Sequence, residues 1–189
     1  MTEFDRLLRR IVDGLERGSL TLQEAAHCVG EHAARRLDCS GAALWTLAGP
    51  PGLRVLTRIG GFDAAINAPL SEPLQFTLAG TSAWMDALSE RRVFATADAQ
   101  SDARLGGGHD AIVDPRRVRG LLQAAIGANA SLWGFVSCAQ YDTPRTWTPR
   151  EIAQLQRIAV ALSIRRSRDR TAARARVALP VPPVSTTSS

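Results

Sequence analysis

Three cysteines and three histidines are the residues of this chain best suited to nucleophilic or metal chemistry. Cys28 and His32, like His27 and Glu31, are four positions apart, so on a helix each pair shares one face within reach of one metal ion. Two ligands do not make a site, and the sequence offers no third ligand for either pair. We therefore expect no metal, and interpret His27 and Glu31 as a solvated pair opposite the apolar face of their helix.

The cysteines could also serve thiol catalysis. Cys28 lies within a predicted helix, Cys39 follows that helix, and Cys138 falls in a predicted strand, where a cysteine is usually a small buried apolar residue. No basic residue adjoins Cys138 in the sequence to lower the pKa of its thiol. An odd count without a CxxC pair fits reduced thiols in a cytosol better than a disulfide framework.

A polar, glycine-rich segment over residues 97–117 holds further candidates. Asp98 and Asp102 could act as a carboxylate pair, but Asp98 more simply caps the start of the loop through local backbone N–H groups. His109 follows three successive glycines, which disfavour regular structure and indicate a mobile loop. We expect a histidine there to be solvated and not a haem ligand.

Aromatic side chains give a stronger candidate for a binding site than the ionisable ones. Trp84 lies on a predicted short helix, Phe94 on the strand after it, and Trp45 on the first predicted strand. Aromatic groups around a concave sheet face are what a small-ligand site needs, although the same side chains would serve equally well as core. The predicted ligand-binding set is Trp45, Trp84, Met85, Phe94, Asp98 and His109.

Two amphipathic helices precede these candidates. Apolar residues recur at helical spacing within residues 1–18. Thr21 and Glu24 then form a capping box for a second helix, whose apolar stripe runs from Leu22 to Leu37. Two consecutive helices with one apolar face each must together cover another part of the molecule.

The covered part is predicted to be an antiparallel sheet. Residues 42–48 and 52–59 form its first two strands, and in the second Leu53, Val55 and Ile59 alternate with Arg54 and Arg58, which is typical of a half-buried strand. Further along, the sequence predicts a helix over 82–90, a strand over 93–96, a hairpin of 118–128 with 132–140 closing at Asn129 and Ala130, and a last helix that begins at Thr148-Pro149 and loses its apolar stripe after Leu162.

This order of elements and three motifs resemble the GAF domain family. The motifs are SAWMDALSERRVFATADAQSDAR (82–104), VRGLLQAAIGANASLWGFVSC (118–138) and YDTPRTWTPREIAQLQRIAVALS (141–163), the last being the most specific. Together they cover roughly residues 20–165. The resemblance implies an α+β, GAF/PAS-like fold, in which the terminal helices lie on one face of an antiparallel sheet and the loops and short helix on the other.

The resemblance also implies a function, because GAF domains as a family bind small molecules and dimerise in bacterial signalling proteins. It divides the chain into an N-terminal helix (1–18), a GAF domain (19–165) and an Arg-rich helix extension with a disordered Pro/Ser tail (166–189). The sequence shows no output domain. We therefore expect a freestanding, non-enzymatic sensor that forms a homodimer through its terminal helices and signals to a partner protein.

Two departures and one alternative accompany this expectation. The three glycines lengthen the loop that usually covers the pocket, and no cysteine context marks a bilin-attaching domain. We expect no identified cofactor, only a small ligand of unknown identity. Some GAF proteins reduce free methionine sulfoxide with cysteines, so a thiol-dependent reductase is the alternative function.

The charge is unevenly distributed along the chain. All 23 basic residues are Arg, so Schiff-base and P-loop lysine chemistry is excluded. Residues 1–144 hold 14 Arg against 16 acids, whereas residues 145–176 hold nine Arg against two acids. No aromatic residue interleaves with the C-terminal arginines, so we do not expect nucleic-acid binding, although an adaptor for nucleic acid or an acidic partner remains an alternative. Without a signal peptide or an apolar membrane span, the protein is predicted to be cytoplasmic.

Overall fold

The computed structural model describes residues 3–50, 52–79, 82–108, 118–128 and 131–177. Within them the helices are α1 (Glu3–Glu16), α2 (Leu22–Leu37), α3 (Ala83–Glu90), the 3₁₀ helix η1 (Ala103–Gly108) and α5 (Pro149–Val177). The strands are β1 (Gly41–Ala48), β2 (Leu53–Asp63), β3 (Ala68–Pro69), β4 (Leu74–Ala79), β5 (Val93–Thr96), β6 (Val118–Ala128) and β7 (Ser131–Tyr141).

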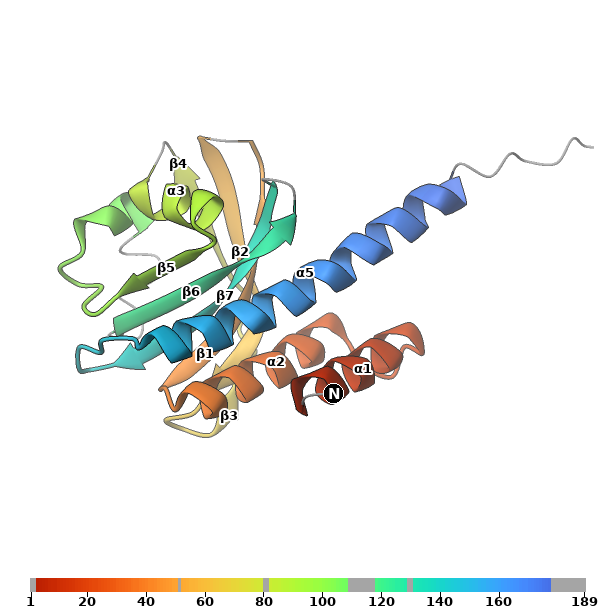
Figure 1. The fold of residues 1–189 in the computed structure, drawn as a ribbon, viewed down its shortest axis with the longest axis horizontal. Coiled ribbons are helices and arrows are strands. Elements are labelled where there is room, and N and C mark those ends of the chain that lie inside the picture. Colours follow the sequence, from red (N-terminus) through yellow and green to blue (C-terminus); the bar gives the residue numbers. More distant parts are fainter. Residues whose placement is uncertain (1–2, 51, 80–81, 109–117, 129–130, 178–189) are drawn as a thin grey trace, which may run out of the picture.

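The strands form one antiparallel sheet in the order β3-β2-β1-β7-β6-β5, and β4 also pairs with β2. Figure 1 shows α2 and α5 lying across one face of the sheet, with α1 beside α2. Helix α3 lies on the other face. This is the predicted α+β architecture, with terminal helices on one face and the short helix and loops on the other.

The sheet separates two apolar cores. The helix-side core joins α2 and α5 to alternate residues of the central strands, including Leu122 and Ala124 of β6 and Val136 of β7. The loop-side core lies beneath α3 and η1 and takes the intervening residues, such as Leu121 of β6 and Phe135 of β7. Because successive strand residues point to opposite faces, each central strand contributes to both cores.

Helix α2 approaches the sheet with little side-chain material between them. A Cβ on Gly30 would lie 2.8 Å from the carbonyl oxygen of Ala42 and 2.9 Å from the Cα of Gly61. A Cβ on Gly60 would lie 2.9 Å from the carbonyl oxygen of Gln23. Backbone therefore packs on backbone along this contact, and larger residues would force the helix away from the sheet.

The predicted helices and strands are all present, but several boundaries differ. Strand β2 extends to Asp63, and β3 and β4 lie between residues 60 and 81, where the sequence analysis predicts no strand. The segment predicted to be irregular contains η1, and α5 continues well past Leu162. The hairpin turn at residues 129–130 and the tail at 178–189 lie outside the described residues.

The predicted phase of β2 was wrong. Leu53 is exposed, while Leu56 is buried in the loop-side core and Arg58, two positions later on the same face, is only 6% exposed. Strand β4 pairs with β2 over Leu53–Arg58, so most of this part of β2 lies between two strands and is not an edge of the sheet. Leu22, predicted to begin the apolar stripe of α2, is exposed as well.

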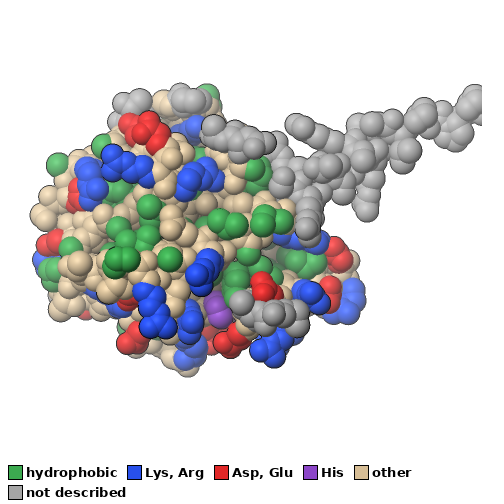
Figure 2. Space-filling view, in the orientation of Figure 1, with side chains coloured by type: hydrophobic (Ala, Val, Ile, Leu, Met, Phe, Trp, Pro, Cys, Tyr) green, Lys and Arg blue, Asp and Glu red, His purple; other side chains and the backbone are tan. Residues whose placement is uncertain are grey.

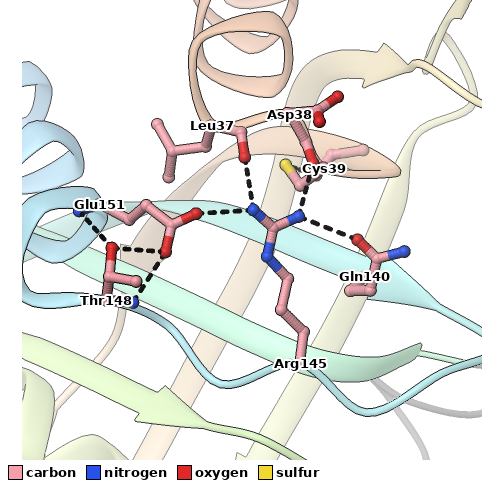
Figure 3. A network of polar contacts seen from close by, with 8 residues as sticks. Leu37, Asp38, Cys39, Gln140, Arg145, Thr148 and Glu151 are labelled. Carbon is pink, nitrogen blue, oxygen red and sulfur yellow. Dashed lines mark hydrogen bonds and ion pairs between the residues drawn. The ribbon is translucent and has the colours of Figure 1, made fainter.

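The side chain of Arg145 joins three elements at one end of the molecule (Figure 3). One guanidinium nitrogen, Nη2, donates to the carbonyl oxygen of Leu37 at 2.7 Å and to Oε1 of Glu151 at 2.6 Å. The other, Nη1, donates to the carbonyl oxygen of Asp38 and to Oε1 of Gln140. The last carbonyls of a helix lack partners within it, so Arg145 satisfies the end of α2 while holding β7 and the start of α5.

The start of α5 is fixed by the same glutamate. Thr148 and Glu151 form the predicted capping arrangement, in which the Thr148 hydroxyl accepts from the Glu151 N–H and the Glu151 carboxylate accepts from the Thr148 N–H at 2.7 Å. Burial opposes ionisation of Glu151, but the bonds from Thr148 and Arg145 outweigh it and lower the pKa of the carboxyl group.

Replacing Arg145 with Lys should lower the free energy of unfolding by about 2 kcal/mol, because an ammonium cannot serve four acceptors in one plane. Urea unfolding measures the change. Arg150→Lys is the matched control, since Arg150 is exposed in the first turn of α5 and should change stability by less than about 0.5 kcal/mol. Equal effects of the two substitutions would contradict the bridging role of Arg145.

Glu151 should make stability depend on pH in the acid range. Its pKa is lower in the folded protein than in the unfolded chain, so the carboxylate stabilises the fold above the ordinary glutamate value and loses this effect as the pH falls through the folded value. Glu151→Gln should therefore destabilise the protein at neutral pH, and the difference from wild type should shrink below about pH 4.5. A difference that is constant with pH would contradict this assignment.

Candidate functional site

Four aromatic side chains form a row across the loop-side face of the sheet. Phe76 of β4 stacks on Trp45 of β1 with ring centroids 6.0 Å apart, and Trp45 stacks on Phe135 of β7 at 5.9 Å. Trp84 of α3 meets Phe135 edge-on at 6.0 Å. The row, named here the aromatic row, runs from β4 through β1 and β7 to α3, and its rings pack against one another inside the loop-side core.

Helix α3 is positioned to complete this row. The hydroxyl of Ser82 caps the helix by accepting from the N–H of Met85. Trp84 and Leu88, four positions apart, are both fully buried and so share the face that meets the sheet. Met85 is half-buried and packs at the margin of the same core.

A buried polar group lies beside the aromatic row. Gln123 of β6 is 0% exposed, and its Oε1 accepts from Nε1 of Trp84 at 2.5 Å. Its Nε2 has no hydrogen-bond partner within the described part of the chain. Ser137 of β7 is the residue directly opposite in the ladder and is also buried. A buried amide donor without an acceptor costs about 1–3 kcal/mol, so this position favours a molecule that supplies an acceptor.

A positive charge is buried on the same face. Arg58 of β2 pairs with Trp45 in the β1–β2 ladder, and its Nη2 donates to the carbonyl oxygen of Glu72 at 2.7 Å. The loop-side face thus combines aromatic surface with an amide donor and a cation.

Ion pairs fasten the segment that follows β5. Asp102 accepts two bonds from Nε of Arg104, whose guanidinium also lies 4.7 Å from the centre of the Phe94 ring and donates to the carbonyl oxygen of Ala95. The hydrogen bond from Arg104 lowers the pKa of Asp102 to about 2. Arg104 thereby holds η1 over β5.

The structure brings part of the predicted set together. Trp45, Trp84 and Phe94 are all buried in the loop-side core, with Met85 at its edge. Asp98 instead forms an ion pair with Arg119, at 2.6 Å between Oδ2 and Nη2, and the hydrogen bond from Arg119 lowers the pKa of Asp98. It also accepts from the N–H of Gln100, as a loop cap does. His109 lies outside the described residues.

Sequence reasoning missed four residues of this face: Phe76, Phe135, Gln123 and Arg58. Gln123 interrupts an otherwise apolar strand, which is a signal that the sequence offers directly. Arg58 was interpreted as facing solvent because the phase of its strand was wrong. Phe76 belongs to β4, a strand that the sequence analysis did not predict.

The candidate metal pairs lie on α2, away from this face. His27 and Glu31 form the predicted pair, with Nε2 and Oε2 3.9 Å apart and about a third of each side chain exposed. Nδ1 of His27 is also 3.2 Å from the carbonyl oxygen of Gly61, and the ring contacts Phe62, so His27 is half-buried against the sheet and not fully solvated. Glu31 pairs with Arg35 at 2.9 Å. Over the described residues, no three His, Cys, Asp or Glu side chains gather where they could share a metal ion.

All three cysteines are separate from the aromatic row. Cys39 and Cys138 are buried in the helix-side core, and Cys28 packs against the same core from α2. The hydrogen bond to Cys39, together with burial, raises the pKa of the Cys138 thiol well above its ordinary value. The residue proposed for thiol catalysis therefore faces away from the candidate ligand site.

No helix within the described ranges combines the length and apolar character needed to cross a membrane.

Comparison with known proteins is consistent with this architecture. The family model of the GAF domain matches residues 21–165. The fold is similar to the blue-light-absorbing form of the PixJ GAF domain of Thermosynechococcus elongatus (19% identity, TM-score 0.55, covering 84% of this chain and 95% of that one). It is also similar to the GAF domain of an Acinetobacter phosphoenolpyruvate-protein phosphotransferase (13% identity, TM-score 0.54, 86% and 92% covered).

A bacteriophytochrome of R. palustris, RpBphP3, shares the fold over 86% of this chain and 36% of its own length (17% identity, TM-score 0.56). No curated protein matches the sequence. The solved structures are too distant to show more than a shared fold. The family model, however, spans most of the chain, from the capping box of α2 to the part of α5 that packs on the sheet, and the chain belongs to the GAF domain family.

Proposed function

We propose that this protein is a non-enzymatic, cytoplasmic sensory module that binds a small molecule on the loop-side face and signals through its terminal helices to a partner protein. The observation that carries the proposal is the unused amide donor of Gln123, fully buried beside the aromatic row. A core optimised only for stability gains nothing from an unsatisfied donor, whereas a binding site uses such a group to orient its ligand.

The surroundings of Gln123 indicate the kind of ligand. The aromatic row favours a flat, largely apolar molecule, and the amide donor favours a carbonyl or ring-nitrogen acceptor at one edge. Arg58 adds a positive charge on the same face, which favours a neutral or anionic molecule over a cation.

Strand β6 offers a route from this face to the helices. Gln123 points into the loop-side core, while Gly127, four residues along the same strand, donates its N–H to the hydroxyl of Ser163 on α5 at 3.0 Å. The same hydroxyl donates to the carbonyl oxygen of Ala159, so α5 is hydrogen-bonded to the end of the strand. A ligand that shifts β6 would thereby shift α5 as well.

The second copy in a homodimer would cover an apolar strip on α5. Val160 and Ile164, four positions apart, are 55% and 50% exposed and border a groove of about 340 Å³ between α5 and β6. Figure 2 shows hydrophobic side chains gathered along this face of the molecule. A self-complementary contact on a two-fold axis would bury both residues of both copies, and would bring the two α5 helices together.

The alternative of a methionine sulfoxide reductase finds less support. A cysteine nucleophile must reach the bound substrate, and all three cysteines lie on the side of the sheet opposite to the aromatic row. The placement of the cysteines therefore supports the sensory function over the thiol-dependent one.

Native mass spectrometry of the purified chain tests the ligand proposal. We expect a mass per chain, in the monomer or the dimer, above the 20.3 kDa of the bare chain, with the retained small molecule as the difference. In Gln123→Leu, loss of the donor should lower occupancy about ten-fold, which corresponds to about 1.4 kcal/mol. Gln75→Leu is the matched control, because Gln75 is exposed on β4. Identical spectra for wild type and Gln123→Leu would contradict the proposal.

Sedimentation velocity tests the homodimer. Wild type should sediment as a dimer, and placing charges in the apolar strip with Val160→Glu and Ile164→Glu should weaken association by at least about ten-fold. Ile66→Glu provides the control, since Ile66 is 72% exposed in the turn before β3 and lies away from α5. A wild-type monomer, or equal effects of the two kinds of substitution, would overturn this arrangement.

A further inference from the structure

Two cysteines lie thiol to thiol in the helix-side core. Cys39 directly follows Asp38, the residue that caps α2, and Cys138 lies in β7 opposite Ala42 of β1. Both belong to one buried cluster, and the Cys39 thiol donates to the carbonyl oxygen of Gly41 at 3.5 Å. The side chain of Cys138 and the backbone of Ala139, the next residue, both lower the pKa of Cys39, which places the Cys39 sulfur beside Cys138. The pairing joins residues from distant parts of the sequence, which only the fold brings together.

The environments of the two thiols differ. Cys39 is 6% exposed and Cys138 is 0% exposed, so Cys39 is the one closer to solvent. The hydrogen bond from Cys138 lowers the pKa of Cys39 against the effect of burial, and the nearby charge of Arg145 acts in the same direction. Figure 3 shows Cys39 beside the carbonyls of Leu37 and Asp38 that Arg145 binds. Of the two thiols, Cys39 is therefore the one that ionises more readily, and Cys138 is the one that stays protonated.

We propose that Cys39 and Cys138 form a site of reversible oxidation, at which a hydroperoxide closes a disulfide bond between the end of α2 and the centre of the sheet. The Cys39 thiolate attacks one oxygen of the peroxide, the O–O bond breaks, and the departing hydroxide takes up a proton to leave as water. Cys39 is then a sulfenic acid.

The second step uses Cys138. Its sulfur attacks the sulfur of Cys39 and expels hydroxide, which combines with the proton of the Cys138 thiol to form a second water. In total, two thiols and one hydrogen peroxide give one disulfide and two waters. The two sulfurs lose two electrons, and the peroxide gains them.

The disulfide would constrain the chain at a sensitive point. It encloses a loop of about 100 residues, and a cross-link of that length restricts the unfolded chain strongly. It also fixes the residue beside the two carbonyls that Arg145 binds, so the end of α2 could not separate from β7. Oxidation therefore acts on the helix side of the sheet, independently of the proposed ligand face.

Treatment of the native full chain with hydrogen peroxide tests this proposal. After quenching and denaturation, free thiols should fall from three to one, and peptide mapping should find Cys39 linked to Cys138. The thermal unfolding midpoint should rise, and dithiothreitol should restore all three thiols and the original midpoint.

Matched variants identify the thiols responsible. Cys28→Ser should form the same cross-link, because Cys28 lies on α2 outside the pair. Cys138→Ala should form none, and its Cys39 should instead be trapped by dimedone as the sulfenic acid. The map of the wild-type protein decides the question even where a variant fails to fold. Retention of three thiols, loss through Cys28, or irreversible oxidation of Cys39 alone would each overturn the proposal.

Discussion

The guanidinium of Arg145 sets the arrangement of the helices that flank the sheet. It fills the carbonyl end of α2, binds the carboxylate at the start of α5 and reaches Gln140 on β7. Each helix end also has its own cap, Asp38 at the end of α2 and Thr148 with Glu151 at the start of α5, and the planar cation links the two capped ends to each other. Helices α2 and α5 supply eight of the eighteen buried residues of the helix-side core, so the packing of that core depends in part on this one side chain.

The two faces of the sheet carry different kinds of side chain, although each central strand contributes residues to both faces. In β6, Leu122 and Ala124 join the helix-side core, while Leu121 and Gln123 face α3. The helix side is closed by aliphatic packing and by Arg145. The loop side instead carries the aromatic row, a buried cation and an amide whose hydrogen-bonding capacity is only half used. The proposed ligand face and the proposed thiol pair thus lie on opposite sides of one sheet and share no side chains.

Local features were predictable from the sequence, and long-range ones were not. The caps at Thr21, Ser82 and Thr148 depend on residues three positions away, so the starts of three helices follow from short motifs. Several residues of the aromatic site were found because aromatic side chains are large and seldom left exposed. The burial of Arg58 depends on β4, which pairs with β2 across the chain, and no local pattern reports that pairing. The proximity of Cys39 and Cys138 was not predicted for the same reason, because it depends on the pairing of β1 with β7.

Glycine along the contact between α2 and the sheet has a mechanical consequence. At Gly30 and Gly60, helix and strands meet almost without side chains between them. Flexible side chains ordinarily absorb small displacements by changing rotamer, and here there are few to do so. The β1–β2 hairpin and α2 are therefore expected to move together. A change in the twist of β1 and β2 should tilt the helix, because few side chains at the contact can change rotamer to absorb it.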